Sequence, residues 1–272
     1  MGAAIAPPST QKAAAVTLHL ALPLPLRTLL LAGVAAVAIS GCASNRVAMV
    51  APDFSSQSPT QQSALVSQLA QKYRSNPRDK ATLIYYSAAL RSAGQADQAA
   101  SVLENGIATY PDDVDIKVAY AKALASSGRF DQALNVIEDA IDPAAPDWSA
   151  LLVKGAILDQ SGRNQEARAV YQQALLTAPN QPALEANLGL SYAMTNDLQQ
   201  AEAHLRKASK MPGATSQIRQ NLALVVGLQG RFAEAKTILA ADLPPDQVDA
   251  NMAYIKSMIT QQNRWDLIKQ TG

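Results

Sequence analysis

The sequence has few of the residues on which most enzyme and metal sites depend. Its 272 residues include one cysteine, which rules out an internal disulfide, and two histidines. His19 falls in an apolar N-terminal region, and His204 has no cysteine or second histidine as a partner. The HExxH, Walker, GxSxG and CxxC motifs do not occur. We therefore expect a protein that is not an enzyme and that binds no cofactor and no metal.

The chain also lacks an excess of charge of either sign. Lys and Arg total 23, Asp and Glu total 22, and no basic run occurs. Such a balance offers no electrostatic attraction to nucleic acid. The glycines occur singly and do not form a phosphate-binding loop, so we expect no small-molecule substrate. Three Phe and abundant Ala favour helices that pack through small residues.

Residues 1–41 have the features of a lipoprotein signal peptide. Arg27 precedes an apolar run over residues 29–39, which is too short to span a bilayer but suits a signal peptide. The run leads into Ile-Ser-Gly-Cys at residues 39–42. This tetrapeptide resembles the bacterial lipobox, in which the cysteine thiol takes a diacylglyceryl group. The resemblance implies cleavage before Cys42, lipidation of Cys42 and anchoring that is effectively permanent.

The residues after Cys42 suggest where the lipid anchor resides. By resemblance to the enterobacterial sorting rule, Ala43 in place of Asp implies the outer membrane, with the protein facing the periplasm. Residues 42–59 contain Ser and Pro without periodicity, and we predict a flexible tether. Its mean reach would be about 20–25 Å, so the following domain can stand off the membrane.

Residues 60–272 carry a repeat with a period of 34 residues. Its clearest column consists of four glycines and one asparagine: Gly94, Gly128, Gly162, Asn196 and Gly230. Glycine suffers no Cβ clash in the left-handed conformation that ends many helices, and Asn is the usual substitute. Each of the five lies between stretches with apolar residues at helical spacing, so each predicts the turn of a helical hairpin.

Columns of small and large residues accompany the turns. The small residues before the turn are Ser87, Ala121, Gly155, Gly189 and Ala223, and those after it are Ala99, Ala133, Ala167, Ala201 and Ala235. The large residues before the turn are Leu90, Leu124, Leu158, Tyr192 and Val226, and those after it are Leu103, Ile137, Tyr171, Leu205 and Leu239. Four prolines follow second helices: Pro111, Pro146, Pro179 and Pro212. Facing small residues would let paired helices approach closely.

These columns resemble the tetratricopeptide repeat. The resemblance implies an all-α, right-handed solenoid with units at about 80–113, 114–147, 148–181, 182–215 and 216–246. Caps are expected over 60–76 and 246–272, the second with a helix to about Gln262 and a short segment from Trp265 to Lys269. Trp265 is a candidate either to cap that helix or to contact a partner.

Two departures from the repeat pattern concern packing. Charged residues replace the bulky residue at the fourth position of three units: Lys117, Glu185 and Arg219. Asp242 replaces a small residue in the fifth unit, which we expect to be the loosest. Separately, Asp112, Asp113 and Asp115 gather at a predicted helix start, where the helix dipole favours acids, and we interpret them as caps and not as a metal site.

In tetratricopeptide folds the first helix of each unit lines a concave groove that holds partners. Carrying the groove positions over to this sequence places one row at Ala88, Lys122, Ala156, Leu190 and Leu224. Asn187 and Asn221 fall in a neighbouring row, where an amide could hold the backbone of an extended peptide. The Asn and Lys/Arg clamp for C-terminal carboxylates is not reproduced in the expected order. We expect a mostly apolar groove for a peptide or helix; alternatively, both Asn side chains only satisfy local backbone groups.

The C-terminal repeats are similar to those of the TadD family, repeat lipoproteins of the tight-adherence (Flp) pilus assembly system. The similarity covers about residues 216–260 and includes NLALVVGLQGRF at 221–232, ADL at 241–243 and NMAYI at 251–255. It implies a pilotin-like assembly factor whose partners are the outer-membrane secretin and pilus assembly subunits. Two alternatives are a scaffold or pilotin of another pilus or secretion system, and an activator of a cell-wall synthase.

Overall fold

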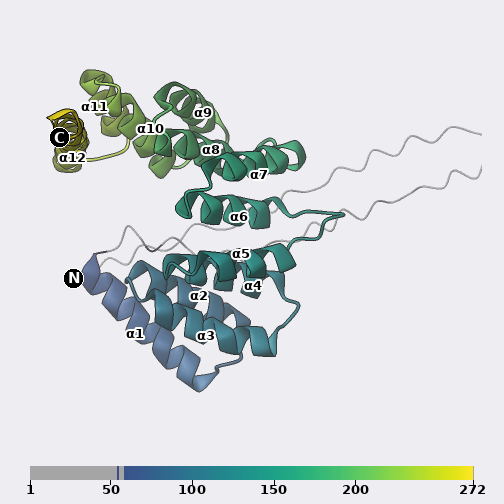
Figure 1. Ribbon diagram of the computed structural model, residues 1–272. Helices are drawn as coiled ribbons and strands as arrows, with labels where there is room; N and C mark the ends of the chain where they lie inside the picture. The colour runs from purple at the N-terminus through teal and green to yellow at the C-terminus, as the bar shows by residue number, and fades with distance from the viewer. Residues whose placement is uncertain (1–53, 55–57, 272) are drawn as a thin grey trace, which may run out of the picture. The chain divides into compact units, whose positions relative to one another are not determined.

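The computed structural model describes residue 54 and residues 58–271, and this part of the chain contains twelve helices and no strand (Figure 1). The helices are α1 (Pro59–Ser75), α2 (Lys80–Ser92), α3 (Ala96–Thr109), α4 (Val114–Ser126), α5 (Phe130–Asp139), α6 (Trp148–Gln160), α7 (Asn164–Thr177), α8 (Pro182–Met194), α9 (Leu198–Lys210), α10 (Ser216–Leu228), α11 (Phe232–Ala240) and α12 (Pro245–Thr271). The signal peptide, Cys42 and nearly all of the tether lie outside the described residues.

The helices form hairpins that stack in chain order. The even-numbered helices α2 to α10 are the first helices of the five hairpins, and α3 to α11 are the second helices. Each helix from α1 to α11 packs on the next one, and each first helix also contacts the first helix of the following unit. The first helices therefore make a continuous layer, and residues at equivalent positions of neighbouring units lie at the same level of adjoining helices.

The five predicted turns are confirmed by their backbone conformation. Gly94, Gly128, Gly162 and Gly230 have φ between 75° and 81°, and Asn196 has φ of 63°. Asn196 is the only non-glycine residue with positive φ in the described part of the chain. After each turn, a backbone N–H donates to the carbonyl four residues before the turn residue, as from Gln95 to Leu90 at 2.8 Å. This bond satisfies a carbonyl that the helix end leaves open.

Side-chain caps mark the start of α1 and of four of the five first helices. Ser58 caps α1 in a reciprocal pair with Gln61, and Pro59 stands at the first helical position. Side chains of Asp79, Asp113, Asp147 and Thr215 cap α2, α4, α6 and α10. Of the three clustered acids, Asp113 is thus the cap, whereas Asp115 accepts a hydrogen bond from Lys80 Nζ at 2.8 Å and Asp112 is exposed.

The columns of small residues are buried where paired helices cross. In the third unit the helices are so close that a Cβ added to Gly155 would lie 2.3 Å from Cε1 of Tyr171. Nine of the ten large residues beside these columns are also buried. Tyr192 is the exception, since it is only partly buried; Arg168 lies over its ring at 4.2 Å and His204 stacks on it at 5.5 Å.

Ion pairs occupy the three units that lack the bulky fourth-position residue. Lys117 Nζ lies 2.5 Å from Asp139, and Glu185 is bound by Lys207 and His204. In the fifth unit Arg219 makes two hydrogen bonds to Asp242, at 2.5 and 2.8 Å. The two departures of that unit are therefore partners, which argues against the loose packing expected there.

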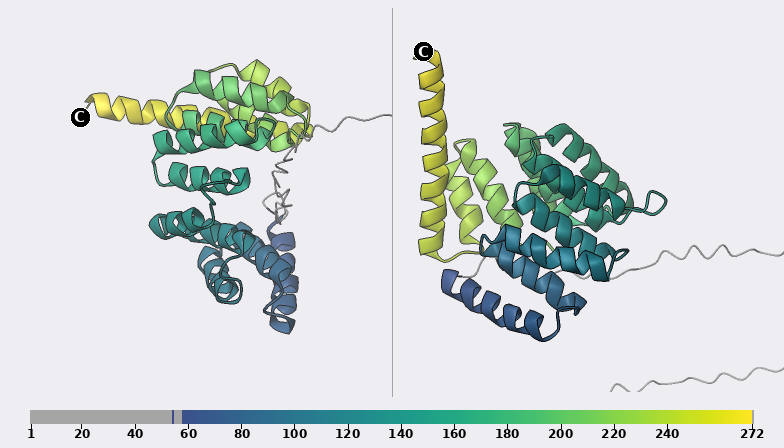
Figure 2. Two further views of the ribbon diagram at one scale, coloured as in Figure 1. Left: turned by 90° about the vertical axis from the view of Figure 1, so that its right-hand side faces the viewer. Right: turned by 60° about the horizontal axis from the view of Figure 1, so that its bottom comes forward.

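The last helix is longer than the sequence pattern predicts. We expected it to end near Gln262, but α12 continues to Thr271, and no Pro or Gly interrupts residues 246–271. This helix packs against α10 and α11 (Figure 2). Its residues Val248, Met252 and Ile255 are buried in one cluster with residues of those two helices. A Cβ on Gly227 of α10 would lie 2.7 Å from Cγ2 of Ile255. The first half of α12 thus covers the end of the stack, while the side chain of Trp265 lies outside the described residues.

Candidate partner-binding surface

The predicted groove residues form one row across the layer of first helices. Ala88, Lys122, Ala156, Leu190 and Leu224 lie on α2, α4, α6, α8 and α10, and all five are partly exposed. The residue that follows each of them in sequence is buried. We call these five residues the first-helix row. Because neighbouring first helices are in contact, the row is a continuous strip that an extended chain could follow.

The two asparagines beside the row are bonded within their own helices. Asn187 Nδ2 donates to the Ala183 carbonyl at 2.8 Å, and Asn221 Oδ1 accepts from Gln217 Nε2 at 3.2 Å. Asn187 keeps its carbonyl oxygen available, and Asn221 keeps its amide hydrogens. Asn187 therefore serves a backbone carbonyl of its own helix, as the alternative interpretation expects, whereas Asn221 bonds to a side chain and not to the backbone. Because an amide has two N–H donors and an oxygen with two lone pairs, each side chain still has a donor and an acceptor left for a peptide backbone.

Lys122 is the charged member of the row, and the structure brings a second cation to it. Arg91, in the last turn of α2, donates from Nε to Ser126 Oγ of α4 at 3.1 Å. Both cations are partly buried, and neither forms an ion pair with a carboxylate among the described residues. Burial, and then the charge of Arg91, lowers the pKa of Lys122 to about 8. Burial also lowers the pKa of the Arg91 guanidinium.

Sequence reasoning missed Arg91, although a signal for it was present. Arg91 follows Ala88 by three residues, and residues three apart share one face of a helix. The equivalent position in the other units holds Ala125, Asp159, Ala193 and Gly227. The cation therefore occurs in the first unit alone, and a search for repeated features passes over it.

His204 of α9 lies against an ion pair between the buried Glu185 of α8 and Lys207 of α9. Its Nδ1 lies 2.8 Å from Oε2 of Glu185, and Lys207 donates to the other carboxylate oxygen at 2.6 Å. Glu185 is only 2% exposed. Burial alone would raise the pKa of Glu185, but the bonds from His204 and Lys207 bring it below its usual value. His204 is thus a partly buried helix residue that contacts a carboxylate of the preceding helix.

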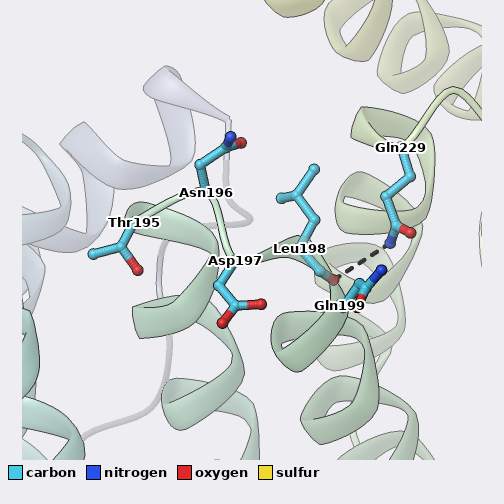
Figure 3. A pocket seen from close by; sticks show the side chains of 6 residues that line it. All are labelled: Thr195, Asn196, Asp197, Leu198, Gln199 and Gln229. Atoms are coloured by element: carbon cyan, nitrogen blue, oxygen red, sulfur yellow. Dashed lines mark hydrogen bonds between the residues drawn. The ribbon is translucent and has the colours of Figure 1, made fainter.

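A pocket lies at the turn between α8 and α9 (Figure 3). It is lined by Thr195, Asn196, Asp197, Leu198, Gln199 and Gln229. The polar groups there serve the backbone: Asp197 caps α9, and Gln229 Nε2 donates to the Leu198 carbonyl at 3.4 Å. No group of three or more His, Cys, Asp and Glu in the described part of the chain could hold a metal ion. Among the same residues, no helix is both long and apolar enough to cross a membrane.

Comparison with known families agrees with the observed architecture. Residues 90–154 and 152–215 match family models described as tetratricopeptide repeat. The protein is therefore an all-helical tetratricopeptide-repeat solenoid, a fold that typically acts as a scaffold for protein interactions. The curated proteins contain no match to this sequence.

Solved structures with the same fold come from proteins of diverse roles. A thermophilic TPR protein of Thermus thermophilus has 19% identity and a TM-score of 0.54, over 71% of this chain and 98% of that one. PilW, titled a widely conserved type IV pilus biogenesis factor, has 17% identity and a TM-score of 0.54, over 68% and 88%. The human IFIT1 dimer with PPP-AAAA has 16% identity and a TM-score of 0.52, over 65% of this chain and 45% of that one. The present chain thus spans less than half of IFIT1, and at these identities the likeness concerns the fold.

Proposed function

We propose that this protein is a lipid-anchored assembly factor with a pilotin-like role in Flp (tight-adherence) pilus biogenesis at the outer membrane. The first-helix row carries the interaction part of the proposal. It offers a strip of partly exposed side chains across five adjoining helices, with small and apolar residues at four of the five positions. Such a strip suits an extended peptide or a partner helix.

The lipobox at residues 39–42 supports the anchor. A lipid on Cys42 and a tether of about 17 residues would hold the repeat domain within about 20–25 Å of the membrane. Capture of a membrane partner would then be partly intramolecular, which raises its effective concentration without any new contact.

The C-terminal similarity to the TadD family supports the link to a pilus. The similar segment, residues 216–260, corresponds to α10, α11 and the first half of α12, which pack on one another. Lys256 of α12 lies 5.7 Å from the ring centre of Phe232 in α11, so residues from separate parts of the segment meet. The segment is thus one packed unit at the end of the stack. The shared fold of PilW, whose title names type IV pilus biogenesis, points in the same direction.

Crosslinking in intact cells followed by affinity purification tests this function. We expect secretin and pilus assembly subunits with the wild-type protein, and their loss with Cys42→Ser, which removes the lipid-accepting thiol. Ser44→Ala is the matched control, because it alters a neighbouring residue and leaves the lipobox intact. Recovery of cell-wall synthases instead would favour the enzyme-activator alternative and overturn the pilus assignment.

A second arm of the experiment tests the surface. Leu190→Asp places a charge in the first-helix row, whereas Leu176→Asp places it on the second helix α7, where the leucine side chain is 85% exposed. We expect Leu190→Asp to reduce partner recovery and Leu176→Asp to leave it unchanged. Equal recovery with both variants would show that partners bind elsewhere.

A further inference from the structure

Arg91 of α2 and Lys122 of α4 form a pair of cations at the first-helix row, and most of their N–H groups are not used by the fold. Ser126 Oγ accepts from Arg91 Nε at 3.1 Å and donates to the Lys122 carbonyl at 2.9 Å. Ser126 thereby connects the Arg91 side chain, which comes from the first unit, to the turn of α4 that carries Lys122. This bond uses one of the five guanidinium donors of Arg91.

Other partly buried cations of the described chain have partners. Lys80 binds Asp113 and Asp115, Lys117 binds Asp139, and Lys154 binds Glu138. Arg168 has no carboxylate partner, but it donates to the Ser191 carbonyl and to Thr195 and lies over the ring of Tyr192. Arg91 and Lys122 depart from this pattern, because their remaining N–H groups meet no acceptor among the described residues.

The two cations are close enough for the charge of Arg91 to lower the pKa of Lys122, and like charges that are partly buried destabilise a folded protein unless an anion joins them. The helix dipole favours Arg91, which lies in the last turn of α2, but Lys122 precedes the last turn of α4 and gains less. The low pKa of Lys122, about 8, agrees with a cation that lacks a counter-charge. Arg91 and Lys122 are therefore arranged to bind an anion that another molecule supplies.

We propose that Arg91 and Lys122 form a carboxylate-binding subsite for an Asp or Glu side chain within an extended partner peptide. This rests on the proposed function of the first-helix row as a partner-binding strip. The row continues on both sides of Lys122, with Ala88 on α2 and with Ala156, Leu190 and Leu224 beyond it. A chain that follows the row therefore passes the cation pair and does not end there. The planar guanidinium of Arg91 and the ammonium of Lys122 together can bind both carboxylate oxygens.

The geometry of the row also predicts the spacing of the partner motif. Adjoining helices pack roughly 8–10 Å apart, so the two steps from Lys122 on α4 to Leu190 on α8 span roughly 16–20 Å. An extended chain advances about 3.3 Å per residue. We therefore expect the acidic residue to be followed or preceded by an apolar residue about five or six positions away.

Selection from a library of random twelve-residue peptides tests the subsite on the full-length protein in detergent. The peptides are fused at both ends, so that they carry no free carboxyl terminus. We expect the wild-type protein to enrich Asp and Glu about fivefold or more at one position of the motif. The double variant Arg91→Met with Lys122→Met should lose this acidic enrichment but should still enrich an apolar residue at the second position of the motif. Lys210→Met is the matched control, because Lys210 is exposed on α9, away from the row, and its loss should leave the acidic preference unchanged.

Each outcome decides the proposal. In a recovered peptide, Glu→Gln should weaken binding to wild type about tenfold or more, and binding to the double variant by much less. Acidic enrichment that persists in the double variant, or apolar enrichment without acid in the wild type, overturns the subsite but leaves peptide binding by the row intact. If every selected peptide binds the Leu190→Asp variant as well as the wild type, or if none is selected, peptides do not bind to the first-helix row. That result would overturn the row as a binding surface and the subsite with it. A preference seen only with free peptide ends would assign the cations to a terminal carboxylate and overturn the side-chain assignment.

Discussion

Replacing Gly155 with alanine tests how closely the helices of the third unit cross. The added Cβ would lie 2.3, 2.7 and 2.8 Å from three ring atoms of Tyr171, well inside van der Waals contact. The ring has little room to move, because Tyr171 is 1% exposed and its hydroxyl donates to Asp159 Oδ2 at 3.0 Å. Asp159 also accepts from Ser191 at 2.7 Å, so a shifted ring would disturb the contact with the fourth unit as well.

The expected free energy change combines opposing effects. Alanine favours a helix over glycine by about 0.5–1 kcal/mol. Overpacking costs about 1–3 kcal/mol, and moving the hydroxyl away from a buried carboxylate costs about 1–3 kcal/mol more. We therefore expect Gly155→Ala to lower the free energy of unfolding by about 1–5 kcal/mol. Among the equivalent pairs, Ala121 with Ile137 and Ala223 with Leu239 show that an aliphatic partner can accept the Cβ, whereas at Gly189 an added Cβ would lie 2.9 Å from Cγ of Leu205.

Urea unfolding of a double-mutant cycle with Tyr171→Leu measures this effect. In the leucine background Gly155→Ala should stabilise by up to about 1 kcal/mol, which reverses its sign. Gly128→Ala is the control: φ is 78° and nothing lies within 4 Å of its added Cβ, so its cost of about 1 kcal/mol should not depend on residue 171. Equal effects of Gly155→Ala in both backgrounds would refute the close crossing.

The remaining predictions concern stability and its pH dependence. Lys122→Met should raise the free energy of unfolding by about 1–2 kcal/mol at pH 7, because the folded state holds the lysine pKa at about 8, below its unfolded value. This advantage should be full below pH 8 and vanish as the pH rises above the unfolded pKa; a constant difference in urea unfolding from pH 7 to 11 would contradict it. Glu185→Gln should lower the melting temperature at pH 7, and this decrease should become smaller as the pH falls below about 4.5, since a lowered carboxyl pKa contributes stability that is lost as the pH falls through it; a decrease that is the same at neutral and at acidic pH would argue against the ion pair. Asn196→Ala should cost about 1 kcal/mol and Asn196→Gly almost nothing, since φ is 63°; chemical denaturation should separate the two. Ala167→Leu, at a position with no exposed surface, should cost about 1–3 kcal/mol, and an unshifted melting temperature would refute this.

The repeat and its turns could be predicted because they depend on interactions within a few residues. Whether a helix ends at Gly94 or Asn196 is decided by the φ that these residues accept and by a hydrogen bond from the following N–H to a carbonyl five residues before it. Ser58 and Asp113 likewise cap the helices that follow them directly. The end of α12 was predicted too early, because a weakening apolar pattern does not stop a helix unless a breaker is present.

The charged contacts needed the tertiary structure, because they join residues from different helices. In the sequence, Glu185 and Arg219 are isolated departures from the repeat pattern. Only the packing of the chain shows that Glu185 forms an ion pair with Lys207, and Arg219 with Asp242. Asn187, chosen as a peptide contact, donates to its own helix, a rotamer preference that spacing does not reveal.

For this protein, then, the sequence alone determined the period, the hairpin turns and the columns of small residues, because these rest on local backbone conformation and side-chain size. Stacking of the units decided which side chains meet across helices. It placed Arg91 of the first unit beside Lys122 of the second, although no repeated spacing connects them. That meeting depends on the approach of α2 to α4 and on two long side chains, and the period of the repeat specifies neither.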